Sequence, residues 1–196
     1  KNLKNHKYLF IINIIYFILG FVNIHFSLLG LICMFLPMVL LVRTNKKTYC
    51  QGYCPRASLY TKAGKLTSKF SMKTPAYFIK GNMKYLMLTY FGISLFFITM
   101  STTRVASGAM NPLEQLRFFI VLPIPFRLPQ LYELNNVLPW LTHLAFRFYS
   151  MMMTTTIIGL VLAFVYKPRT WCTICPISTI SGIYIDSQKS TQEAAA

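Results

Sequence analysis

Three long apolar blocks, nearly free of charge, dominate this sequence. The first runs from Tyr8 to Val42, the second from Tyr85 to Thr103, and the third from Leu141 to Tyr166. A bilayer core of roughly 30 Å needs about 20 such residues per helix, and a helix satisfies its own backbone polar groups there. Charged residues make up only 12% of the chain, against roughly a quarter in soluble domains. The blocks therefore predict an integral membrane protein.

The first block is too long for one span and contains a polar notch at Asn23, Ile24 and His25. It therefore predicts a hairpin of two short spans. The expected fold is all-α, a four-transmembrane-helix bundle that forms a single membrane domain over residues 1–196. The predicted spans cover about residues 8–24, 26–42, 85–103 and 141–166. The loop 43–84 is expected to hold short interfacial helices, and the Pro-rich loop 104–140 a re-entrant or interfacial segment at Phe118–Phe126.

Basic residues predict the orientation in the membrane. The chain has 20 Lys and Arg against 4 Asp and Glu, and its net charge is +16. All basic residues lie at the termini or in the loop 43–84, except Arg104, Arg117, Arg127 and Arg147. The positive-inside rule then places both termini and this basic loop in the cytoplasm, at a bacterial inner membrane. Contact with membrane lipid accounts for the charge, and no nucleic-acid binding motif is present.

Four of the five cysteines form two short motifs, Cys50-Gln-Gly-Tyr-Cys54-Pro55 and Cys172-Thr-Ile-Cys175-Pro176. Each motif follows the cytoplasmic end of a predicted span, so a hairpin topology brings the pairs to one depth. Four thiols in a reducing compartment indicate a metal site more than disulfides. Thiolates bind both zinc and iron–sulfur clusters, and the Pro after the second Cys favours a cluster. We therefore predict one [4Fe–4S] cluster, ligated by Cys50, Cys54, Cys172 and Cys175.

The two prolines also suggest local structure. Pro55 and Pro176 are suited to the first position of short helices, where a missing N–H costs nothing. Such helix N-termini would direct free N–H groups toward an anionic cluster. Arg56, Lys167 and Arg169 lie close in sequence and are expected to offset the same charge. Cys33 lies within a predicted span and is interpreted as a small buried hydrophobic residue.

Both motifs carry a family resemblance. The segments that begin Tyr49-Cys50-Gln-Gly-Tyr and Lys167-Pro-Arg-Thr-Trp resemble the paired motifs of the membrane "4Fe-4S binding domain" proteins. This group is similar to the membrane ferredoxin-like proteins of periplasmic nitrate and nitrous-oxide reduction. The resemblance implies electron transfer at the inner membrane. The second motif has two residues between its cysteines, where those relatives usually have three.

Polar residues near the outer ends of spans suggest a second cofactor. His143 and Arg147 are one helical turn apart and share a face, and His25 lies in the predicted turn. Ionisable groups at such depth are candidates for function. His25 and His143 are hypothesised to ligate a b-type haem or to hydrogen-bond a quinone, with Arg147 supplying charge. The alternative is structural: His25 caps a turn, while His143 and Arg147 pair with Glu114 or Glu133 or extend to the interface.

The predicted function is a one-electron relay rather than an enzyme acting on its own. The donor would be on the cytoplasmic side and the acceptor in the membrane or outside it, with ferredoxin-, flavin- or cytochrome-type redox partners. A full set of Cys ligands leaves no iron open to a substrate, and an oligomer remains possible. Two alternatives stay open: a membrane thiol–disulfide oxidoreductase that uses the two Cys pairs, and a zinc-stapled structural subunit.

Overall fold

The computed structural model describes residues 8–66, 72, 74–75, 78, 82–113, 115–119, 122–123, 130–131 and 137–194. The described part is mostly helical and divides into two compact units. Unit 1 comprises Lys1–Ile11, Met34–Phe91 and Gly159–Ala196, and unit 2 comprises Ile12–Cys33 and Gly92–Ile158. Each of the four long apolar helices contributes residues to both units. A single membrane domain over the whole chain stays a prediction.

Within the described residues, three helical segments are long and apolar enough to cross a membrane. The first is Ile24–Thr44, which joins the 3-10 turn η2 (Ile24–Leu28) to helix α2 (Leu29–Thr44). The others are α5 (Met83–Ala106) and α6 (Pro139–Val165). These segments coincide with the predicted spans near residues 26–42, 85–103 and 141–166, and their length and composition are those of membrane-crossing helices.

Helix α1 is apolar but shorter than the span predicted for it. It covers Leu9–Val22, 14 residues, which at 1.5 Å per residue is roughly 21 Å. A bilayer core is roughly 30 Å thick. The predicted span at residues 8–24 is therefore present as an apolar helix, but its length alone does not make it membrane-spanning.

The predicted turn after α1 is confirmed and has a simple local cause. Asn23 has an extended backbone and caps η2, because its side-chain oxygen accepts the backbone N–H of His25 at 2.9 Å. Asn is among the preferred residues at such a position, since it satisfies a donor that the helix itself leaves unpaired. The polar notch in the first apolar block is thus a capping signal.

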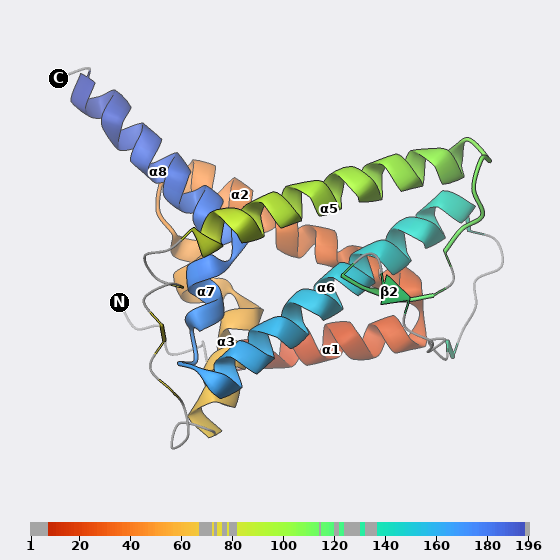
Figure 1. The fold of residues 1–196 in the computed structure, drawn as a ribbon, viewed down its shortest axis with the longest axis horizontal. Helices are drawn as coiled ribbons and strands as arrows, with labels where there is room; N and C mark the ends of the chain where they lie inside the picture. The colour runs from red at the N-terminus through yellow and green to blue at the C-terminus, as the bar shows by residue number, and fades with distance from the viewer. Residues whose placement is uncertain are drawn as a thin grey trace. The chain divides into compact units, whose positions relative to one another are not determined.

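Unit 2 is built around the N-terminal half of α6. Its buried core consists of Ile24, Leu116, Ala145, Phe146 and Tyr149. A side-chain carbon added at Gly20 of α1 would collide with the ring of Tyr149, so the glycine allows α1 and α6 to approach closely, as Figure 1 shows. Tyr149 also donates its hydroxyl hydrogen to the carbonyl oxygen of Phe17, at 3.2 Å.

The loop 104–140 contains a short hairpin that the sequence did not predict. Strands β1 (Arg117–Phe118) and β2 (Leu122–Pro123) pair antiparallel, with Arg117 opposite Pro123. Phe119 adopts a positive φ of 51°, a conformation that tight turns require. The predicted re-entrant segment at 118–126 lies partly outside the described residues, and its position in a membrane stays a prediction.

Unit 1 contains the three helices nearest the cysteine motifs. They are α3 (Pro55–Leu66), α7 (Thr170–Ile174) and α8 (Pro176–Ala194). Tyr60 of α3 is fully buried, and Trp171 and Ile174 of α7 are only 3% and 2% exposed. Figure 1 shows α3 beside the C-terminal part of α6, which continues into α7. These helices form a packed support for both motifs.

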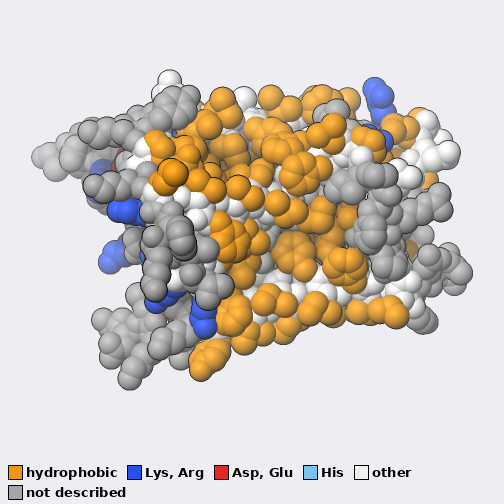
Figure 2. All heavy atoms as spheres, turned by 60° about the horizontal axis from the view of Figure 1, so that its bottom comes forward, with side chains coloured by type: hydrophobic (Ala, Val, Ile, Leu, Met, Phe, Trp, Pro, Cys, Tyr) orange, Lys and Arg blue, Asp and Glu red, His pale blue; other side chains and the backbone are white. Residues whose placement is uncertain are grey.

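Much of the apolar surface is exposed rather than packed inside the protein. Helix α5 carries large exposed side chains, among them Leu86, Phe96 and Phe97. Its buried residues are Ser94, Ile98 and Val105. Figure 2 shows hydrophobic side chains covering much of the face in view, with few Lys or Arg among them. A helix with this surface is suited to contact with lipid, because exposed apolar patches of this extent are rare on soluble proteins.

Candidate metal centre

The two cysteine motifs fold in the same way. In the first, Cys50 lies in the π-helical turn η3 (Tyr49–Tyr53), and α3 begins right after Cys54. In the second, Cys172 lies in the short helix α7, and α8 begins right after Cys175. Each motif therefore places its first cysteine in a helical turn and its second at the start of a longer helix.

Cys54 and Cys175 occupy N-cap positions of α3 and α8. Both have extended backbones, with φ and ψ of −75° and 112° for Cys54 and −61° and 128° for Cys175. The carbonyl oxygen of Cys54 accepts the N–H of Ser58 at 3.3 Å, and that of Cys175 accepts the N–H of Thr179 at 3.0 Å. An N-cap residue has this geometry, and its side chain lies beside the first N–H groups of the helix. The expectation that helix N-termini adjoin the thiols is confirmed for both motifs.

Proline follows each of these cysteines as the first helical residue. Pro55 opens α3 and Pro176 opens α8. Proline is favoured there because its fixed φ suits a helix and the N–H that it lacks would have no helical partner. The prediction from the sequence is confirmed, although α8, at 19 residues, is much longer than the short helix expected.

The unequal spacing of the two motifs is absorbed by the backbone. Three residues separate Cys50 from Cys54, and two separate Cys172 from Cys175. The first motif forms a π-helical turn, whereas the second forms an α-helical one. A π turn closes its hydrogen bond over one residue more than an α turn and is frequent at functional sites. The π turn thus accommodates the extra residue of the first motif, and both motifs still end with a cysteine directly before a helix.

Two close contacts hold the motifs in one unit. A Cβ added at Gly159 of α6 would collide with the ring and hydroxyl of Tyr60, so only glycine allows this buried tyrosine to lie against α6. A Cβ at Gly64 would come within 2.7 Å of the Pro168 ring. Tyr60 and Gly64 belong to the helix that follows the first motif, and Pro168 precedes the second. The two glycines therefore set how closely the segments that carry the cysteines pack.

The four motif thiols interact electrostatically. Burial raises the pKa of Cys50 to about 11, and the thiols of Cys175 and Cys54 add to this rise. Burial also raises the pKa of Cys172 to about 12, with further contributions from Cys54, Cys175 and Cys50. Thiols of both motifs are therefore near enough to act on one another, and at neutral pH Cys50 and Cys172 are protonated in the absence of a bound metal.

Two cations act on these thiols in the opposite direction. Arg169 lowers the pKa of Cys172, as expected from its place in the sequence, and Lys47 lowers the pKa of Cys50. The sequence analysis missed Lys47, although it precedes Cys50 by three residues, close to one helical turn. The Lys47 side chain extends over α8, where its Nζ would lie 3.2 Å from a Cβ built on Gly182.

Four cysteine side chains supply the possible donors at the two motifs. All five cysteines carry thiols rather than disulfides. Four thiolates are the ligands that a [4Fe–4S] cluster takes, and they are soft donors suited to iron–sulfur clusters and zinc. Among the described residues, no three His, Cys, Asp or Glu side chains are closed around the position of a single metal ion. The four thiols are thus near enough to interact electrostatically, but in this structure they do not form a group that could hold a metal ion.

His25 is held by two side chains of unit 2. Its Nδ1 lies 2.7 Å from the side-chain oxygen of Asn23, and its Nε2 lies 3.2 Å from the hydroxyl of Thr142. Because the Asn23 oxygen only accepts, the Nδ1–H donates to it and the Thr142 hydroxyl donates to Nε2. The histidine links the turn after α1 to the start of α6.

His143 is fully buried and also uses both ring nitrogens. Its Nδ1 accepts the backbone N–H of Leu113 at 3.1 Å, and its Nε2 lies 3.0 Å from the hydroxyl of Ser101. The Leu113 bond requires an unprotonated Nδ1, so Nε2–H donates to Ser101. Ligation of a haem by His25 and His143 would require each ring to give up one of these partners. The haem and quinone roles stay predictions.

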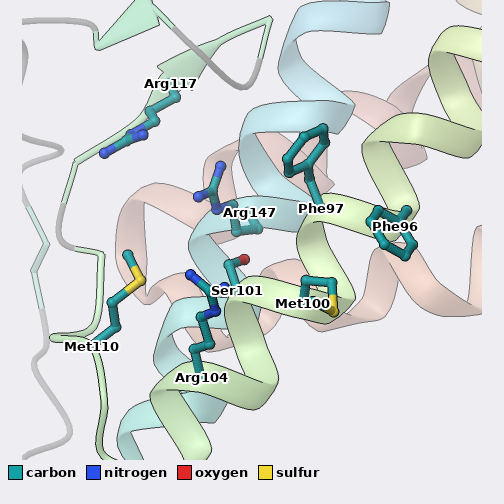
Figure 3. A pocket seen from close by; sticks show the side chains of 8 residues that line it. All are labelled: Phe96, Phe97, Met100, Ser101, Arg104, Met110, Arg117 and Arg147. Carbon is teal, nitrogen blue, oxygen red and sulfur yellow. The ribbon is translucent and has the colours of Figure 1, made fainter.

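Arg147 lies one turn after His143 and is 8% exposed. It lines a cavity of about 360 Å³ in unit 2 together with Arg104 and Arg117 (Figure 3). The predicted partners Glu114 and Glu133 lie outside the described residues. Cys33, interpreted from sequence as a buried hydrophobic residue, is half-buried in α2.

Comparison with known families agrees with the geometry of the motifs. Residues 26–73 and 149–190 match the family model described as 4Fe-4S binding domain. The comparisons with curated proteins and with solved structures gave no match. The two matched stretches contain Cys50, Cys54, Cys172 and Cys175. Through both cysteine motifs the chain is similar to the 4Fe-4S binding domain family, and this likeness supports an iron–sulfur cluster and a role in electron transfer.

Proposed function

We propose that this protein is a membrane-embedded iron–sulfur relay, which passes single electrons from a cytoplasmic-side donor to a membrane or extracytoplasmic acceptor. The observation that carries the proposal is the meeting of two similarly folded motifs. Thiols of both motifs interact within unit 1, and the family match covers both. Four Cys thiolates are the ligand set of a [4Fe–4S] cluster.

In this proposal the thiolates of Cys50, Cys54, Cys172 and Cys175 hold one [4Fe–4S] cluster. When bound, such a cluster takes up and releases one electron without needing a substrate at iron. The first-turn N–H groups of α3 and α8 adjoin the thiolates and favour their negative charge. Lys47 and Arg169 offset part of this charge. Trp171, which directly precedes Cys172 and is 3% exposed, would limit the access of water to the cluster.

The membrane location rests on helix length and charge. Three segments are long and apolar enough to span, and α1 would complete a four-span bundle only with added length, tilt or local thinning of the bilayer. The positive-inside rule supports an inner-membrane protein with both termini and the basic loop 43–84 in the cytoplasm. That orientation presents the cysteine motifs to a reducing compartment, which suits thiolate ligands.

Partners follow from charge and redox chemistry. The basic residues near the motifs would attract an acidic ferredoxin- or flavin-type donor, since complementary charge speeds association. A cytochrome-type protein, a quinone or a b-type haem would accept the electron on the other side, and an oligomer would bring two such relays together. An association with periplasmic nitrate or nitrous-oxide reduction rests on the sequence resemblance and is part of the proposal.

The test is iron and acid-labile sulfide analysis with EPR, on protein purified without oxygen. We expect about four irons and four sulfides per chain and a reduced-cluster signal after dithionite. Replacing any one of Cys50, Cys54, Cys172 and Cys175 by serine removes most of the iron, because a hard hydroxyl replaces a soft thiolate. Cys33→Ser is the matched control and retains the cluster.

Two results would contradict the relay. Stoichiometric zinc would make the four cysteines a structural staple. A metal-free protein whose cysteines titrate as a reversible disulfide would instead indicate a thiol–disulfide oxidoreductase.

A further inference from the structure

One residue of the first cysteine motif differs from its counterparts in exposure. Tyr53, which directly precedes Cys54, is 59% exposed. The residues that directly precede the other three motif cysteines are buried: Tyr49 is 6% exposed, Trp171 is 3% exposed and Ile174 is 2% exposed. Three of these four side chains therefore pack inside the protein, whereas the Tyr53 side chain lies at the surface.

Contacts within the chain do not account for the position of the Tyr53 ring. Among the described residues, the side chain of Tyr53 has no hydrogen-bond or ring partner. Tyrosine is enriched among the residues that contribute most to protein–protein binding, because its ring buries a large area while its hydroxyl keeps a polar contact. Tyr53 therefore has the properties of a contact residue for a partner.

The surface beside Tyr53 is an edge of the candidate metal centre. All four motif cysteines are partly exposed. Of the other thiols, Cys54 acts most strongly on Cys172, so a cysteine of each motif lies near this edge. The rate of electron transfer falls steeply with distance, and a carrier protein that covers Tyr53 would come close to the sulfurs of both motifs.

The segments that carry the cysteines are positively charged. Lys47 and Arg169 act on the thiols of Cys50 and Cys172, and neither cation forms an ion pair with a described residue. The loop 43–84 contains ten Lys and Arg and no Asp or Glu, whereas the whole chain has four acidic residues. Four carboxylates cannot neutralise ten cations, so this loop keeps a positive surplus whatever ion pairs form. Its charge is complementary to an acidic partner.

A membrane surface would also attract cations, and an exposed tyrosine suits the level of lipid head groups. The position of Tyr53 favours a protein instead. Lys46 and Lys47 separate it from Thr44, where α2 ends, and it lies between two of the predicted cluster ligands. Lipid head groups around this ring would close the edge of the site to a soluble carrier.

We propose, on the basis of the relay function above, that Tyr53 is the central contact of a docking surface for an acidic one-electron carrier protein, with Lys47 and Arg169 as flanking cations. Carboxylates of the carrier lie against the two cations, and an apolar part of its surface covers the Tyr53 ring. Interfaces between redox partners are small and weak. In the encounter the reduced carrier loses one electron and the iron–sulfur cluster gains it, while no bond forms or breaks and no proton moves.

The test uses the full chain in neutral detergent, after its iron content has been measured, and an oxidised acidic plant-type ferredoxin as the probe. Biolayer interferometry gives the affinity and both rate constants. We expect Tyr53→Ala to weaken binding about tenfold, mainly by faster dissociation, and Tyr53→Phe to keep most of the affinity because the ring makes the contact. Arg169→Gln should slow association about threefold at low salt and have little effect at high salt.

The control is Phe96→Ala, which removes a similarly exposed ring, 63% exposed, from unit 2. Its affinity for ferredoxin should equal that of the unchanged chain. Equally tight binding of a basic cytochrome c would show that charge is not recognised and would overturn the proposal.

The remaining outcomes separate the docking surface from the relay function. A chain that holds its cluster but does not bind ferredoxin, or whose affinity is unchanged by Tyr53→Ala, would overturn the docking surface and leave the relay standing. Loss of iron in Tyr53→Ala but not in Tyr53→Phe would make the ring a structural part of the motif and would also overturn its role as a contact. A chain without iron would overturn the relay itself.

Discussion

Lys47 and Arg169 are the residues that most directly tune the four motif thiols. Both lower the pKa of a neighbouring cysteine, against the effect of burial and of the other thiols. A nearby positive charge stabilises the more negative state of a redox centre, so it raises the reduction potential. The two cations therefore favour the reduced form of the proposed cluster.

Removing either charge should lower the potential. We expect Lys47→Gln and Arg169→Gln each to shift the midpoint downward by on the order of tens of millivolts, with a smaller shift at high salt. The measurement is an EPR-monitored redox titration in detergent. Lys189→Gln is the control, because Lys189 is exposed on α8 and does not act on the cysteines. An unchanged midpoint in both test variants would show that neither charge lies near the redox centre.

At the scale of helices, packing against α6 decides where the first motif lies. Tyr60 is fully buried and lies against Gly159, where any larger residue would meet its ring. Tyr60 is on α3, whose first residue follows Cys54. A change that moves Tyr60 therefore also moves α3, the helix that begins right after Cys54.

Alanine substitutions at Gly159 and Gly92 distinguish the effect of the contact with Tyr60 from the effect of helix propensity. Gly159→Ala should lower iron content and destabilise the protein by about 1–3 kcal/mol, since overpacking forces neighbouring groups to move. Gly92→Ala in α5 meets nothing within 4 Å and should be neutral or stabilising by up to about 1 kcal/mol, because Ala favours helix. Iron per chain and thermal unfolding in detergent check both. Equal behaviour of the two variants would mean that Tyr60 does not position the motif.

On the scale of the whole molecule, the chain divides its features between two units. The cysteine motifs belong to unit 1, whereas His25, His143 and the cavity lined by Arg104, Arg117 and Arg147 belong to unit 2. A ligand that binds only the folded state stabilises the part of the structure that holds it. The proposed cluster should therefore stabilise unit 1 in preference to unit 2.

Chelation of iron under reducing conditions should reveal this difference. We expect backbone amides of α7 and of the first turn of α3 to exchange hydrogen roughly tenfold faster or more after iron removal. The Leu113 amide, which donates to His143 in unit 2, should keep its protection. Hydrogen exchange read by mass spectrometry gives both values in one sample. Uniform loss of protection over both units would show that the metal centre stabilises the chain as a whole.

Local chemistry alone determined several features of this protein. The apolar blocks predicted four spans, and three of them are present as helical segments of membrane length. The notch at Asn23 predicted a turn and the two motif prolines predicted helix starts, and the structure confirms both. Thr154, Thr155 and Thr156 also bond back to carbonyls of their own helix. Capping, proline geometry and periodicity act between residues a few positions apart, so they can be read without knowing the fold.

Contacts between distant residues were decided only by the tertiary structure. The sequence did not indicate that Gly159 admits Tyr60, that Lys47 lies near the thiols, or that Arg104, Arg117 and Arg147 line one pocket. It also overestimated α1, because apolar composition continues past the residue where Asn23 starts a new turn. The end of α1 has a local cause, the cap at Asn23. The contact of Gly159 with Tyr60 and the grouping of the three arginines depend instead on how segments far apart in the chain pack, and packing is set by the fit of side chains across helix surfaces rather than by spacing along any one helix.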